Sequence, residues 1–87
     1  MTDRQGLARA QSLIEVRRYA EAQSALAALL ATEPGSAEAL ILLAICRDGL
    51  EDFAGMLAAA DRAIAAAPDE SEPYRLASVA LRHLGRH

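Results

Sequence analysis

Small and apolar residues recur at intervals of three to four positions along five stretches of the chain, and turn-forming residues separate these stretches. This spacing places apolar side chains on one face of a helix. The predicted helices cover residues 3–16, 19–32, 36–49, 52–66 and 71–84. Pro34-Gly35 ends the second helix, and the third, fourth and fifth begin at Ser36, Asp52 and Ser71, which are suited to capping. The pattern predicts an all-α fold of about five helices.

The third predicted helix contains the longest apolar run, "ALILLAIC" at residues 39–46. One set of its side chains is expected to pack into the neighbouring helices: Leu40, Leu43 and Ala44. A second set lies on the opposite side: Ile41, Leu42 and Ile45. Because a helix that is apolar all round is normally covered on all sides, something is expected to cover this second set. The cover is another polypeptide, a second copy of the chain or downstream sequence, unless neighbouring helices of the same chain bury these residues.

The chain resembles itself at an interval of 34 residues, which aligns Tyr19 with Phe53 and Pro34 with Pro68. Repetition at this interval is typical of proteins that stack helical units. Small residues allow paired helices to approach closely, the aromatic residue fills the gap between neighbours, and the proline enforces a turn. The pattern therefore serves stacking and not chemistry.

Two helices per unit, an aromatic residue opening the second helix, a small residue three positions later and a proline near its end resemble the tetratricopeptide repeat (TPR). The residues are Tyr19, Ala22 and Pro34 in the first unit, and Phe53, Met56 and Pro68 in the second. The resemblance implies a right-handed superhelical stack of antiparallel helix pairs within one domain, 1–87. Its parts are repeat 1 at about 3–36, repeat 2 at about 37–70 and a half repeat at 71–87.

A few positions depart from the family pattern. Met56 replaces the expected alanine, and Arg47 stands where a large apolar residue is usual. Arg17 and Glu51 occupy a turn position where the family favours glycine, whereas Gly85 fits it. None of these departures interrupts a helix pair.

The resemblance further implies a concave groove lined by the first helix of each repeat, which binds a peptide or an amphipathic helix of a partner protein. The residues expected to supply contact area are Leu7, Ile14, Ile41, Leu42, Ile45, Leu76 and Val79. Those expected to orient the partner are Gln11, Asp48, Arg75 and Arg82. One TPR type binds acidic chaperone tails through basic groove residues, but the matching positions here are Leu7, Gln11, Leu42, Glu72 and Leu76. That function is therefore excluded.

Two alternatives remain open. In the first, the chain is a self-associating structural module that forms a homodimer through the groove or through its last helix. Its contact residues would then be Tyr74, Leu81 and Leu84. In the second alternative, the chain is a regulatory fragment of a longer protein. Against both stands the interpretation that the last helix is itself a cap, because Arg75, Arg82 and His83 suit a solvent-facing helix.

Composition and charge exclude several classes of protein. The chain has 87 residues, a net charge of −3, one Phe, two Tyr and no Trp, so it lacks the basic stripe and the stacking aromatics of a nucleic-acid binder. Its apolar runs are too short to span a membrane, and it begins with no signal peptide, so a cytoplasmic location is expected. The use of Arg with no Lys or Asn is typical of GC-rich bacterial genomes.

No enzymatic chemistry is predicted. Cys46 lies mid-helix among apolar residues, where a buried packing role is expected. His83 and His87 are four positions apart but lack the further ligands that a zinc site needs. The acidic run at 69–72 lacks the ligand spacing of a calcium loop and is read as a solvated turn. The sequence therefore predicts neither metal nor cofactor.

Overall fold

The computed structural model describes residues 4–85, and these form five helices without a strand. The helices are α1 (Arg4–Glu15), α2 (Tyr19–Thr32), α3 (Ala37–Gly49), α4 (Phe53–Ala66) and α5 (Glu72–His83). The all-α prediction is confirmed, and each helix end lies within one residue of the predicted position or its cap.

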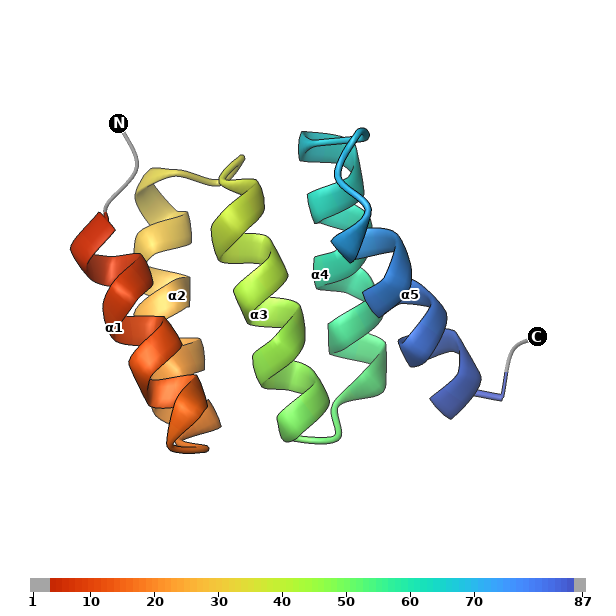
Figure 1. The fold of residues 1–87 in the computed structure, drawn as a ribbon, viewed down its shortest axis with the longest axis horizontal. Coiled ribbons are helices and arrows are strands. Elements are labelled where there is room, and N and C mark those ends of the chain that lie inside the picture. Colours follow the sequence, from red (N-terminus) through yellow and green to blue (C-terminus); the bar gives the residue numbers. More distant parts are fainter. Residues whose placement is uncertain (1–3, 86–87) are drawn as a thin grey trace.

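The helices form a stack of two layers, in which consecutive helices run antiparallel (Figure 1). Within the described residues, α3 contacts all four other helices, whereas α2 does not contact α4 and α1 does not contact α5. Helices α1, α3 and α5 therefore form one layer, and α2 and α4 form the other. We call the surface formed by α1, α3 and α5 the inner face.

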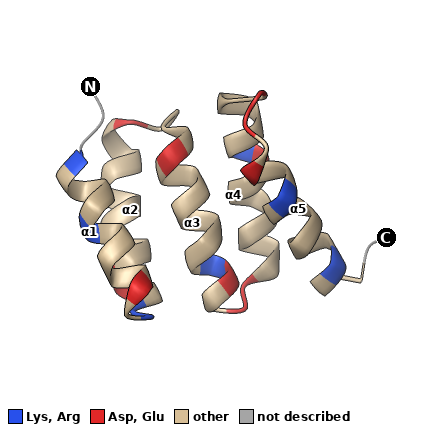
Figure 2. Ribbon diagram, in the orientation of Figure 1, with Lys and Arg blue, Asp and Glu red and all other residues tan. Residues whose placement is uncertain are grey.

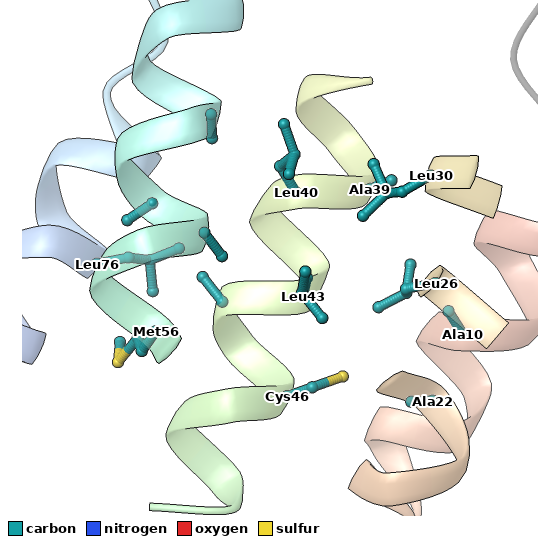
Figure 3. Packing of buried hydrophobic residues seen from close by; sticks show 14 of the residues in the cluster. Ala10, Ala22, Leu26, Leu30, Ala39, Leu40, Leu43, Cys46, Met56 and Leu76 are labelled. Carbon is teal, nitrogen blue, oxygen red and sulfur yellow. The ribbon is translucent and has the colours of Figure 1, made fainter. Parts of the chain in front are cut away.

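The core that joins the layers consists largely of alanine and leucine (Figure 3). Leu26 of α2, Leu40 of α3 and Met56 of α4 retain at most 1% of their exposure. Leu43 and Ala44 are also buried, so the predicted inward set of α3 is confirmed. Many core residues are alanines, and their small side chains let the helices approach closely.

Two of the three predicted helix caps form. Ser36 Oγ accepts a hydrogen bond from Ala39 N at 3.3 Å, and Asp52 Oδ1 accepts one from Gly55 N at 3.0 Å. Ser71 precedes α5 but its side chain makes no capping hydrogen bond. The reason lies in its backbone, whose φ of −82° and ψ of −30° are already helical, whereas a capping residue usually has non-helical angles.

The turns after α1, α3 and α5 each contain one residue in the left-handed conformation. Arg17 has a φ of 62°, Glu51 of 59° and Gly85 of 74°. Arg17 and Glu51 carry a Cβ in this conformation, which costs about 1–2 kcal/mol per residue relative to glycine. The family's preference for glycine here thus has a backbone origin, and the stack forms despite the strain.

Arg47 of α3 forms hydrogen bonds to α2 and α4, the two helices of the other layer. Its Nε donates to Gln23 Oε1 of α2 at 3.1 Å, and its Nη1 donates to the carbonyl oxygen of Gly55 in α4 at 3.0 Å. The half-buried guanidinium is therefore satisfied where the family usually places an apolar side chain.

The two aromatic residues that open α2 and α4 pack against equivalent positions. A Cβ added to Gly49 would lie 2.5 Å from Cε2 and Cζ of Tyr19, so this ring lies directly over the glycine. In the next unit His83 takes the place of Gly49, and its ring stacks on Phe53 with centroids 4.0 Å apart and planes 3° from parallel. His83 is therefore a packing residue at the end of α5.

Candidate functional site

The inner face carries a strip of apolar side chains that the stack covers only in part. All are half-buried and pack against the core. They are Ile14 of α1, Ile41, Leu42 and Ile45 of α3, and Val79 of α5. Neighbouring helices therefore cover most of each side chain and leave a smaller part of it accessible to solvent. We call these five residues the apolar strip.

Two adjoining hollows open beside this strip. The smaller, of about 150 Å³, lies between α1 and α3 and is lined by Leu7, Gln11, Glu38, Ile41 and Leu42. The larger, of about 520 Å³, lies between the α2–α3 and α4–α5 connections, and is lined by Gly35, Ser36, Ala37, Glu38, Ile41, Ala67 and Glu70. Glu38 and Ile41 line both hollows, so the two adjoin each other at these residues.

Two predicted contact residues are in fact part of the core. Leu7 is 4% exposed and Leu76 is 3% exposed, so neither supplies appreciable contact area. This corrects the groove assignment, in which both were expected to contact a partner. Leu7 forms only the floor of the smaller hollow, and Leu76 stabilises the packing of α5 on the stack.

The polar residues predicted to orient a partner are all exposed: Gln11, Asp48, Arg75 and Arg82. Arg75 is already paired, because its Nε and Nη2 donate to Glu72 Oε1 and Oε2 at 2.7 and 2.9 Å. These hydrogen bonds lower the pKa of Glu72 and raise the pKa of Arg75, to which Asp48 adds a smaller favourable charge interaction. Arg75 is therefore held by Glu72 of its own helix.

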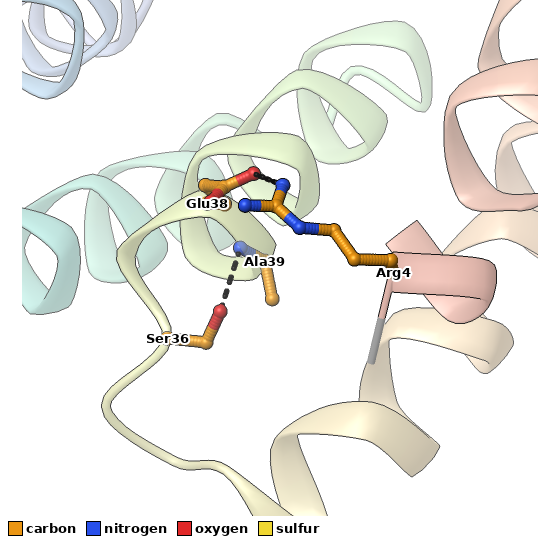
Figure 4. Close-up of polar contacts among 4 residues, drawn as sticks. All are labelled: Arg4, Ser36, Glu38 and Ala39. Carbon is orange, nitrogen blue, oxygen red and sulfur yellow. Dashed lines mark hydrogen bonds and ion pairs between the residues drawn. The ribbon is translucent and has the colours of Figure 1, made fainter. Parts of the chain in front are cut away.

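A further ion pair crosses the inner face between α1 and α3. Arg4 reaches across to Glu38, with Nη1 3.3 Å from Oε2 (Figure 4). Both side chains remain largely exposed, at 78% and 59%. Sequence reasoning missed this pair, although the two residues are separated by one repeat interval of 34 and so occupy equivalent positions on adjacent helices.

The predicted self-association residues lie along α5. Tyr74 is 47% exposed and its hydroxyl donates to the carbonyl oxygen of Pro68 at 3.0 Å, while Leu81 and Leu84 are half-buried. Two other large apolar residues are exposed and were not singled out: Val16 at 64% and Leu50 at 42%. They directly follow α1 and α3, at the same repeat position as Leu84 after α5, so exposed apolar area is not confined to the last helix.

Two of the side chains weighed for chemistry, Cys46 and His83, have packing roles. Cys46 is fully buried and points from α3 toward the α1–α2 side (Figure 3), and burial raises the pKa of its thiol to about 11. Such a thiol is not a nucleophile at neutral pH. No group of three or more His, Cys, Asp or Glu residues within residues 4–85 could hold a metal ion. His87, the second member of the predicted histidine pair, lies outside the described residues.

The paired antiparallel helices and the exposed inner face define a helical-repeat protein. The family model described as tetratricopeptide repeat matches residues 13–85. The chain therefore belongs to the tetratricopeptide repeat family, as its 34-residue pattern predicted. Repeats of this family generally mediate interactions between proteins and are generally not enzymatic.

No curated protein and no solved structure matches the chain. Among the helices in residues 4–85, none is long and apolar enough to cross a membrane.

Proposed function

We propose that the inner face binds a peptide or amphipathic helix of another protein. The observation that supports this is the apolar strip, whose residues are anchored in the core yet remain partly exposed beside two adjoining hollows. A partner that covers the strip removes this remaining apolar area from water. Fully burying one Ile or Leu contributes about 1.5–3 kcal/mol, so completing the burial of several half-buried side chains supplies a useful binding energy.

The polar residues beside the strip would set the direction of the bound segment. Gln11 on α1, Asp48 on α3 and Arg82 on α5 are exposed. Hydrogen bonds at such a rim contribute more to specificity than to affinity.

We also propose that α1–α2 and α3–α4 are the two complete repeats, and that α5 begins a third.

Self-association is the second candidate function. The exposed Tyr74, together with the half-buried Leu81 and Leu84, offers apolar area on α5 that a second copy can cover. In that case the mass in solution rises with concentration, and Leu84→Asp abolishes the rise.

The first test is a binding experiment on a double variant, Ile41→Asp with Ile45→Asp. Peptides selected from a displayed random 12-residue library on the unmodified protein are the probes. We expect the double variant to bind them at least about 30-fold more weakly, because hot-spot side chains contribute about 2 kcal/mol or more each. Calorimetry measures the affinity, and circular dichroism checks that the helices persist.

The matched control places the same two charges on the outer layer, in Ala54→Asp with Ala58→Asp. Both alanines are exposed on α4, one helical turn apart, as Ile41 and Ile45 are on α3. The control should bind the peptides normally. Equal weakening in both variants would contradict the proposal. Loss of helical structure in the first variant alone would show that Ile41 and Ile45 serve mainly as core residues.

A further inference from the structure

We propose that the segment bound on the inner face carries an arginine or lysine beside its apolar residues, and that this basic side chain enters the larger hollow between Glu38 and Glu70. The inference rests on the proposed function and adds the chemistry of the partner. It assigns a basic, amphipathic segment of another protein, and not an acidic one.

The walls of the larger hollow suit such a side chain. Glu38 comes from the first turn of α3 and Glu70 from the α4–α5 connection, so the two carboxylates come from different parts of the chain. Ile41 and Ala67 provide apolar surface between them. Long basic side chains lay their aliphatic stem on apolar surface and keep the charged head at polar groups. A guanidinium also forms strong, charge-assisted hydrogen bonds with carboxylates.

The charge around this end of the inner face is mainly negative (Figure 2). The acidic residues of the two connections and of the helix starts beside them are Glu33, Glu38, Asp69, Glu70 and Glu72. Of the arginines at this end, Arg4 and Arg75 are each already bonded to one of these carboxylates. Even with Arg62 of α4, which also lies toward this end, the carboxylates outnumber the arginines. A surplus of negative charge attracts a basic segment and repels an acidic one.

The two carboxylates of the hollow are available to a partner. Within residues 4–85, the Glu70 side chain forms neither an ion pair nor a hydrogen bond. Glu38 is held only by Arg4, in an exposed pair of a kind that contributes little to stability. An incoming cation can therefore replace Arg4 at Glu38, and Glu70 offers a second carboxylate in the same hollow.

The shared lining of the two hollows connects this charge to the apolar strip. Ile41 and Glu38 line both, and Leu42 lines the smaller one. A segment that rests an apolar side chain on Ile41 and Leu42 thus brings its next residues to the mouth of the larger hollow. An apolar residue followed closely by a basic one is the pattern that this geometry favours.

The test uses a peptide from the same library that binds the inner face, prepared with its basic residue and with glutamine in that place. We expect the unmodified protein to prefer the basic form about tenfold, as hydrogen bonds between charged groups imply. The preference should vanish in Glu38→Gln with Glu70→Gln. It should persist in the control Glu51→Gln with Asp61→Asn, which removes the same charge from exposed positions elsewhere.

Arg4→Gln tests the role of Glu38 in the opposite direction, through a gain in affinity for the basic peptide. Because it frees Glu38 from the one ion pair that it forms among residues 4–85, this variant should bind the basic peptide more tightly than the unmodified protein does. A merely structural role of Glu38 would not produce this gain.

Three results would overturn the inference. Selected peptides that depend on Ile41 and Ile45 but show no basic preference would refute it while leaving the proposed function intact. The same follows if the preference survives in Glu38→Gln with Glu70→Gln. Self-association of the protein that is lost in that variant would make a second copy the occupant. If no selected peptide depends on Ile41 and Ile45, the proposed function itself fails.

Discussion

Replacing Leu40 by alanine should lower the free energy of unfolding by about 2–5 kcal/mol. Leu40 is 1% exposed and belongs to α3, the helix that contacts all four others. The substitution leaves a cavity that neighbouring side chains can hardly fill. Many of the buried residues on α3 and α4 are alanines, which have no side-chain rotamers to adjust. Small domains are stable by only about 5–15 kcal/mol, so this loss brings the protein close to unfolding.

Leu42→Ala is the matched control for that prediction. The residue, the helix and the substitution are the same, but Leu42 belongs to the half-buried apolar strip. We expect a smaller loss than at Leu40, because part of the Leu42 side chain already contacts water and the cavity left behind is open to solvent. Urea unfolding followed by circular dichroism measures both losses. Equal losses would mean that Leu42 is a core residue and that α3 presents no free apolar side.

Replacing Gly49 by valine should cost about 1–3 kcal/mol, through overpacking against Tyr19. Gly49 ends α3 without a left-handed backbone, so its lack of a side chain matters for space and not for conformation. The Tyr19 ring occupies the position that any Cβ there would need. The ring must therefore move, and it loses its contact with the end of α3. The thermal unfolding midpoint should fall accordingly.

Two further variants show whether the Tyr19 contact is the cause. A Cβ on Gly35 would meet nothing within 4 Å, so Gly35→Ala should leave stability unchanged or slightly raised. Tyr19→Ala should cost less in the Gly49→Val background than alone, since the valine can occupy space that the ring leaves. Strictly additive losses would show that the two positions are not coupled.

The sequence predicts the helices and the core well, because both depend on local patterns. Apolar spacing located all five helices, and the capping types of Ser36 and Asp52 marked two of the helix starts correctly. The inward side of α3 followed from the repeat register, which places Leu40 and Ala44 toward the neighbouring helices. Ser71 failed as a cap because its backbone is already helical there, which composition does not reveal.

The inner face was predicted less well, because it depends on how far each helix rotates in the stack. Family register placed Leu7 and Leu76 in the groove, but the neighbouring helices bury both. The pairing of Arg4 with Glu38 was detectable from their separation by one repeat interval. The placing of Glu38 and Glu70 at one hollow was not, because it depends on how the α2–α3 and α4–α5 connections are placed at one end of the stack. The bacterial origin suggested by the arginine usage stays a prediction.

The most direct test of the inner face as a binding surface is a nuclear magnetic resonance map of the complex. A selected 12-residue peptide is titrated into the labelled protein, and the shifts of backbone amides and Ile and Leu methyl groups are recorded. We predict that the largest changes fall on Gln11, Ile41, Leu42, Ile45 and Val79, and that the outer surfaces of α2 and α4 are unaffected. Changes concentrated on those outer surfaces, or on Tyr74 and Leu84 alone, would contradict the assignment of the inner face as the binding site.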